Sequence, residues 1–87
     1  MSKHDKLLLK ILRGTSDANI PFHDLRQLLH HLGFEERIRG SYHTFRRDGV
    51  EEKINLQQDG NHAKPYQVRQ VKAIIIKYRL GDGNSDA

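Results

Sequence analysis

Cysteine is absent from this chain of 87 residues, and no apolar run approaches the roughly 20 residues that a membrane-spanning helix needs. Without cysteine there are no disulfide bonds, which is compatible with a reducing cytoplasm. Charges interrupt the apolar start MSKHDKLLLKILRG, so we expect neither a signal peptide nor a membrane segment. No histidine pair has a metal-binding spacing such as H-E-x-x-H, so we also expect no metal and no other cofactor. These absences predict a cytoplasmic protein.

The charge balance gives the first indication of a partner. The chain has 15 lysines and arginines against 11 aspartates and glutamates, which gives a formal net charge of +4 and a pI of about 9.6. The last seven residues, GDGNSDA, hold two aspartates and no basic residue, so the rest of the chain is more basic than the whole. Such an excess of positive charge makes a polyanion a reasonable partner.

Apolar residues at steps of three and four predict two helices in the first third of the chain. Residues 3–13 have this spacing, and Gly14 can end the helix. A second apolar stripe occupies residues 22–32 and stops at Gly33, with Asn19 as a candidate N-cap.

The apolar period then changes to two, which predicts three short antiparallel strands in FEERIR, SYHTFRR and VEEKINLQ. Phe34 and Ile38 share one face of the first strand. A tight turn is expected at Gly40, and Asp48-Gly49 is the strongest hairpin signal of the chain.

The third strand and the last helix complete the predicted core. Ile54 and Leu56 are expected to point inward and Lys53 outward. Pro65 opens a long amphipathic helix that Gly81 follows. The apolar face of this helix comprises Val68, Val71, Ile74, Ile75 and Tyr78.

The element order α-α-β-β-β-α predicts an α+β domain, in which helices cover one face of a three-stranded antiparallel sheet. The other face of the sheet is left open to a ligand. We expect one domain over residues 1–80, with residues 1–14 as an additional N-terminal helix and residues 81–87 as a disordered tail.

The segment RGSYHTFRRDG, residues 39–49, is the strongest candidate for a functional site. Tyr42 and His43 have opposite parity, and His43 shares its face with Phe45. If Phe45 packs inward, His43 tends inward and Tyr42 faces the open side. A bulge at Gly40 would re-aim His43. Two interpretations of His43 are therefore open. It is either a half-buried, hydrogen-bonded histidine or an exposed, catalytic histidine at the strand start.

Several polar side chains near this segment are candidates for phosphate contacts. They are Ser41, Arg46, Arg47, Lys53 and Lys64. Lys53 has the parity of the polar sheet face. Lys64 precedes Pro65 at a helix start, where free backbone N–H groups attract anions. A solvated lysine is the alternative. His62, in the loop before Lys64, is a candidate second proton-transfer group.

Two stretches, LGFEERIRGSYHTFRRDGVEEKINLQ and AKPYQVRQVKAIIIKY, together resemble the HicA family of small bacterial toxins from HicA–HicB toxin–antitoxin systems. The resemblance covers about residues 20–80. The α-β-β-β-α part also resembles the double-stranded RNA-binding domain in its element order. Many relatives read Gly-Ser-His-His where this chain has Gly40, Ser41, Tyr42 and His43.

This resemblance implies a metal-independent endoribonuclease, an mRNA interferase that cleaves mRNA with a histidine and is silenced by a HicB-like antitoxin. Tyr42 occupies the slot of the first histidine, which is usually the catalytic one, whereas other relatives carry a single histidine in the second slot. The candidate catalytic residues are therefore His43 and Tyr42. Imidazole suits proton transfer near neutral pH, whereas a phenol is a poor base that can stack on a nucleobase or donate to a phosphate.

Two other functions remain open from the sequence. Tyr42 in the histidine slot is compatible with a non-catalytic RNA-binding module of the same fold. A protein that only sequesters an antitoxin would have no affinity for RNA. We expect the free toxin to be a monomer.

Overall fold

A computed structural model of the chain describes residues 3–13, 20–58 and 60–80. Its elements are α1 (Lys3–Arg13), α2 (Phe22–His31), β1 (Glu35–Arg39), β2 (Tyr42–Arg47), β3 (Val50–Gln57) and α3 (Pro65–Tyr78). The predicted order and the α+β class are confirmed. The predictions for Gly14, Asn19, Gly81 and the tail over 81–87 lie outside the described residues.

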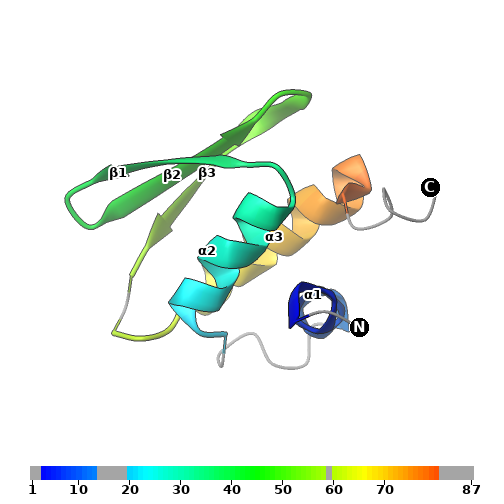
Figure 1. The fold of residues 1–87 in the computed structure, drawn as a ribbon, viewed down its shortest axis with the longest axis horizontal. Helices are drawn as coiled ribbons and strands as arrows, with labels where there is room; N and C mark the ends of the chain where they lie inside the picture. The colour runs from blue at the N-terminus through cyan, green and yellow to red at the C-terminus, as the bar shows by residue number, and fades with distance from the viewer. Residues whose placement is uncertain (1–2, 14–19, 59, 81–87) are drawn as a thin grey trace.

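The described residues form three layers (Figure 1). The strands make an antiparallel sheet in the order β1-β2-β3, so β1 and β3 are its edge strands. The helices α2 and α3 lie on one face of this sheet, with α2 against β1 and α3 against β3, and α1 packs on α2 and α3. The prediction of helices on one face therefore holds for α2 and α3, while α1 lies behind them. No helix in the described ranges is long and apolar enough to cross a membrane.

Both hairpins turn through two residues with a glycine at a positive φ. Gly40, the first residue of the β1–β2 loop, has φ 59°, and Gly49, the second residue of the β2–β3 loop, has φ 88°. Glycine reaches this region without the steric cost of a Cβ. The register of β2 and β3 shifts between Phe45 and Arg47. The irregularity is therefore not at Gly40, and alternation from Tyr42 to Phe45 is regular.

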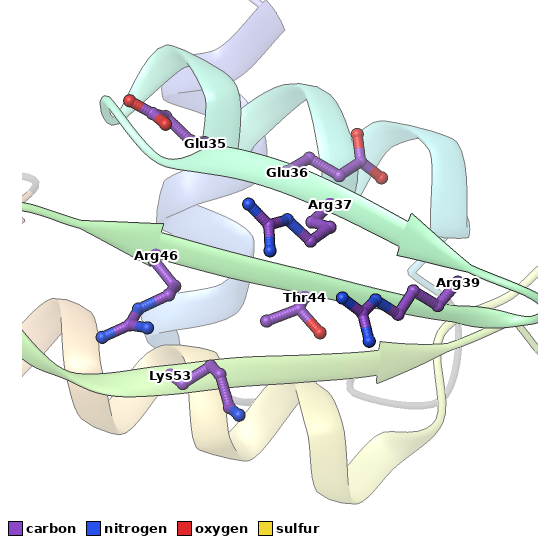
Figure 2. Close-up of a pocket in the computed structure, with 7 residues that line it drawn as sticks. All are labelled: Glu35, Glu36, Arg37, Arg39, Thr44, Arg46 and Lys53. Carbon is purple, nitrogen blue, oxygen red and sulfur yellow. The ribbon is translucent and has the colours of Figure 1, made fainter.

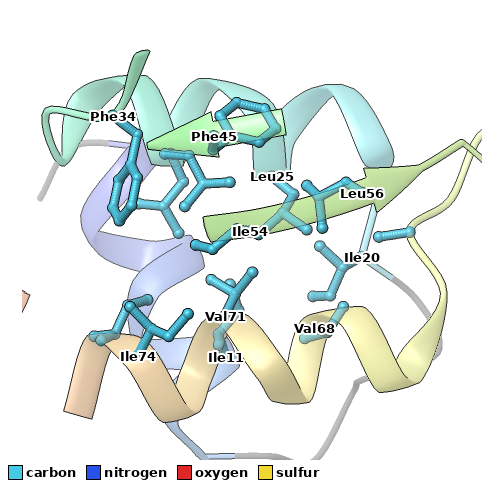
Figure 3. Close-up of a cluster of buried hydrophobic side chains, with 14 of the residues drawn as sticks. Ile11, Ile20, Leu25, Phe34, Phe45, Ile54, Leu56, Val68, Val71 and Ile74 are labelled. Atoms are coloured by element: carbon cyan, nitrogen blue, oxygen red, sulfur yellow. The ribbon is translucent and has the colours of Figure 1, made fainter. Parts of the chain in front are cut away.

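One apolar core joins all three layers (Figure 3). Phe45, Ile54 and Leu56 point from the sheet into it and are completely buried. The helices contribute Leu25, Leu28, Leu29, Val68, Val71, Ile74 and Ile75, and α1 adds Ile11. Full burial of such a side chain stabilises the fold by about 1.5–3 kcal/mol.

Phe34 and Ile38, which share one face of the first strand, differ in burial. Phe34 is buried, but Ile38 on the same face is 53% exposed. Figure 1 shows the reason, because the β1–β2 turn projects beyond α2. The last residues of β1 therefore have the inward parity without a helix to cover them.

The C-terminal end of α3 is fixed by the Arg79 backbone and by contacts with β3. Arg79 adopts the left-handed conformation, with φ 54°, and its N–H donates to the carbonyls of Ile75 and Ile76. The Tyr78 hydroxyl and the Lys77 amine both contact the Glu52 carboxylate of β3. These contacts fix the end of α3 to the sheet and leave the open face of the sheet unaffected.

Candidate functional site

Four basic side chains stand together on the face of the sheet that none of the described helices covers. They are Arg37, Arg39, Arg46 and Lys53, and all four are exposed. We call them the cationic sheet face. With Glu35, Glu36 and Thr44 they line a shallow hollow of about 420 Å³. Figure 2 shows that they come from all three strands.

The positive charge of this face is not neutralised within the described residues. None of the four side chains makes a hydrogen bond or ion pair with another side chain in the ranges 3–13, 20–58 and 60–80. Two carboxylates, Glu35 and Glu36, also line the hollow, so four cations against two anions leave a net charge of +2. Mutually repelling cations in such a hollow attract a polyanion.

Polar groups without charge lie between these cations. Thr44 Oγ1 donates to Asn55 Oδ1 at 3.1 Å, across the centre of the face. Tyr42 is 56% exposed and pairs with Arg39 at the end of the β1–β2 hairpin. The predicted parity of Tyr42 is thus confirmed, and its ring is available for stacking.

Three of the predicted phosphate-contact residues lie on the cationic sheet face or beside it, and Arg47 does not. Arg46 and Lys53 belong to the cationic sheet face, and Ser41 is exposed in the β1–β2 turn beside Tyr42. Arg47 lies elsewhere, because the register shift after Phe45 turns it toward Gly33, where it is half-buried. Arg47 therefore does not line the hollow of the cationic sheet face, but it shares a second hollow with Arg46 at the β2–β3 turn.

Lys64 is the N-cap residue of α3 and lies next to the end of β3. Its Nζ donates to Gln57 Oε1 at 3.2 Å, and the side chain is half-buried. The buried Gln67 fixes this junction, because its amide, oriented to satisfy both groups, accepts from Gln57 N at 2.9 Å and donates to Gln57 O at 3.3 Å. Lys64 is thus held beside the edge of the open face.

His43 points away from the open face. It is 8% exposed, and its ring lies edge-on to Phe22 with the centroids 5.0 Å apart. An exposed His43 at the strand start, which the catalytic alternative required, is therefore not observed. The reason is that the strand alternates regularly at this position. Its catalytic role stays a prediction.

Three charged or titratable side chains contact the Glu36 carboxylate on the inner side of β1 and form a compact cluster with it. Arg26 donates to both carboxylate oxygens, from Nε to Oε2 at 2.8 Å and from Nη2 to Oε1 at 3.0 Å. His30 Nε2 lies 2.8 Å from Oε1, and His43 Nδ1 lies 2.6 Å from Oε2. We call these four residues the carboxylate–histidine cluster. Figure 2 shows Glu36 and Arg37 leaving β1 in opposite directions.

The cluster keeps the Glu36 carboxylate ionised. Its side chain is 6% exposed. This burial raises the pKa, but the hydrogen bonds from Arg26, His30 and His43 outweigh it and lower the pKa from 4.5 to about 2. A buried carboxylate with both oxygens occupied can orient two imidazoles at once, and each keeps one ring nitrogen that Glu36 does not hold.

The cluster members differ in their access to solvent. The side chain of His30 is 47% exposed, and that of Arg26 is 31% exposed, whereas that of His43 is 10% exposed. His30 and Arg26 lie one turn apart on α2 and therefore on one side of this helix. A ligand outside the cluster meets these two residues first.

Sequence reasoning did not single out Glu36, Arg26, His30, Arg37 or Arg39 as site residues. A signal for Glu36 was present, because it has the inward parity of its neighbours Phe34 and Ile38. A carboxylate in such a position requires partners. Arg37 and Arg39 have the opposite parity in the same strand, which predicts the open face.

Metal binding finds no support in the described part of the chain. No group of three or more histidine, aspartate or glutamate side chains there has the geometry of a metal site.

Comparisons with protein-family models, with curated proteins and with solved structures found no match to this chain.

Proposed function

We propose that the chain is an RNA-binding toxin of the HicA type, with a fold like that of double-stranded RNA-binding domains, and that RNA binds across the cationic sheet face. The observation that carries this proposal is the set of four exposed cations on one open face, none of which pairs with a described side chain. The sequence resemblance supplies the type of system.

The geometry suits a phosphate backbone better than a single small anion. Residues two apart on a strand are about 7 Å apart, and neighbouring strands are about 5 Å apart, so the cations form a two-dimensional lattice. Binding releases counterions from the RNA and is insensitive to base sequence. The exposed Tyr42 adds a ring on which an unpaired base can stack.

The partner we propose is a HicB-like antitoxin in the cytoplasm, which covers the same face and blocks RNA sterically. An open, positively charged sheet face that none of the described helices covers supports this. The antitoxin then needs acidic groups opposite the four cations.

Metal-independent RNA cleavage is the second candidate function. The observation that favours it is the Glu36 carboxylate, which lies 2.8 Å from His30 Nε2 and 2.6 Å from His43 Nδ1, because a carboxylate that orients an imidazole is the usual arrangement of a general base. The burial of His43 favours the non-catalytic RNA-binding module instead. Cleavage of RNA by the purified protein in the presence of a chelator separates the two.

RNA affinity measured across a salt series tests the main proposal. The slope of log K against log salt should be about −3 to −4, since four cations each release about 0.7 to 0.9 counterions. A flat response, or no binding at all, contradicts the proposal and favours a protein that only sequesters an antitoxin. A stable complex with the antitoxin that still binds RNA fully would contradict steric blocking.

A further inference from the structure

We propose that His30 is the imidazole that exchanges a proton with bound RNA, and that Glu36 orients it while His43 only holds Glu36 in place. This inference rests on the proposed RNA binding and assigns the chemistry to the helix side of β1. It differs from what the sequence resemblance implies, which is that His43 is the candidate catalytic histidine.

Access to the substrate distinguishes His30 from His43. A general base must come within hydrogen-bond distance of the proton that it takes. The His30 side chain is 47% exposed, whereas that of His43 is 10% exposed and its ring packs against Phe22. In the cluster, His30 is therefore the imidazole that a polymer can reach.

The orientation of His30 is fixed from two sides. Its Nε2 lies 2.8 Å from Glu36 Oε1, and its ring lies edge-on to Phe45 with the centroids 5.8 Å apart. When Nε2 carries the hydrogen that Glu36 accepts, Nδ1 is the basic nitrogen.

Arg26 places a cation beside this base. Glu36 occupies Nε and Nη2 of the guanidinium, and Nη1 makes no hydrogen bond within the described residues. Its two N–H groups can therefore donate to a phosphate oxygen. This supplies the charge stabilisation that a pentacoordinate phosphorus needs.

The path of the RNA follows from the position of β1 at the edge of the sheet. Arg37 and Arg39 lie on the open side of this strand, and Arg26 and His30 contact its other side through Glu36. A backbone bound to the cationic sheet face crosses the β1 edge and then meets Arg26 and His30. Both sites therefore serve one strand of RNA.

The reaction of this site is transesterification. His30 Nδ1 takes the proton of a ribose 2′-hydroxyl, and the 2′-oxygen forms a bond to the adjacent phosphorus. The bond from phosphorus to the 5′-oxygen breaks, and the leaving 5′-oxygen takes a proton from water. The products are a 2′,3′-cyclic phosphate and a 5′-hydroxyl end, and His30 returns its proton to solvent. DNA is inert because it lacks the 2′-hydroxyl.

His43 acts through Glu36 and is a positioning residue. Its Nδ1 contacts Oε2, so it fixes the carboxylate that orients His30. A glutamine at position 43 can still donate to Glu36 but cannot transfer protons near neutral pH, whereas an alanine can do neither.

The experiment measures RNA cleavage and RNA binding by the full chain, with chelator present, for the unchanged protein and for His30→Gln, His43→Gln and His43→Ala. His31→Gln is the matched control, because it removes an imidazole one residue away, about 100° around the same helix. Thermal unfolding shows that each variant is folded. DNA of the same sequence serves as the inert substrate.

We expect His30→Gln to lower the cleavage rate by about 10²–10⁴-fold with RNA binding retained, as the loss of a general base does. His43→Gln should keep cleavage within about tenfold of the unchanged protein, His43→Ala should lose more, and His31→Gln should not change it. Cleavage that survives His30→Gln, or that His43→Gln abolishes, overturns the inference. A protein that binds RNA but leaves it intact overturns the inference while RNA binding stands. A protein that does not bind RNA refutes the proposed function as well.

Discussion

On the inner side of the sheet, the carboxylate–histidine cluster surrounds one buried carboxylate with a guanidinium and two imidazoles. On the outer side, the cationic sheet face carries four cations, and none of them pairs with a described side chain. Adjacent residues of β1 supply both sides, because Glu36 points inward and Arg37 outward. The same short strand thus carries paired and unpaired charges.

The difference separates charged side chains that stabilise the fold from charged side chains that can bind a partner. Glu36 is buried in surroundings of low polarity, where an unpaired carboxylate has a large free-energy cost, so it must be paired. On the outer side the charged side chains are in contact with solvent and need no partner within the fold. There, like charges repel one another, and a polyanion relieves that repulsion. We therefore expect changes on the inner side to affect stability and changes on the outer side to affect RNA binding.

The largest expected effect is that of Glu36→Ala on stability. This change leaves the Arg26 and His43 side chains without their acceptor in a largely buried setting, and it should lower the free energy of unfolding by about 3 kcal/mol. Denaturant unfolding measures it. Glu35→Ala is the matched control in the same strand and should stay within about 0.5 kcal/mol, because Glu35 is exposed on the outer side. Equal effects of the two changes would contradict the distinction between the two sides.

Acid should unfold the protein through the same carboxylate. The pKa of Glu36 is about 2 in the folded chain and 4.5 as the reference value, so its contribution is fully present above pH 4.5 and is lost as the pH falls toward 2. We expect a loss on the order of 2 kcal/mol over this range. Urea unfolding at a series of pH values measures it. Glu36→Gln should flatten the dependence, and an equally steep loss in that variant would assign it to other groups.

Much of this architecture could be predicted from the sequence, because local patterns determine it. The period of two predicts which side chains of β2 and β3 face inward, and the two glycine turns set the hairpin register. The exposure of Ile38 could not be predicted, because the pattern gives parity but not how far a helix extends over a strand. The contacts of Glu36 were missed because Arg26 and His30 come from a different element, and side-chain pairing between elements leaves no periodic trace.

Binding of RNA should depend on Arg46 and Lys53 of the cationic sheet face. Replacing both with alanine should weaken binding about tenfold at moderate salt and reduce the salt slope by about two, since two phosphate contacts are lost. Filter binding or fluorescence anisotropy at several salt concentrations measures both quantities. Lys6→Ala with Lys10→Ala is the matched control, because it removes the same charge from α1, which lies behind the other helices. If the control lowers the slope equally, net charge rather than this face binds RNA.

The smallest expected effect is that of Lys64→Ala. Lys64 stands at the start of α3, and its Nζ is held 3.2 Å from Gln57 Oε1, at the end of the outer edge strand β3. From there it can reach a backbone that leaves the cationic sheet face, but it contributes one partly solvated contact. We expect a two- to fivefold loss of RNA affinity, roughly 0.4–1 kcal/mol, with the fold unchanged. Anisotropy and circular dichroism measure the two quantities. Unchanged affinity would make Lys64 an ordinary solvated lysine. A loss of helix would instead show that its contact with Gln57 supports the junction of β3 and α3, which Gln67 also holds.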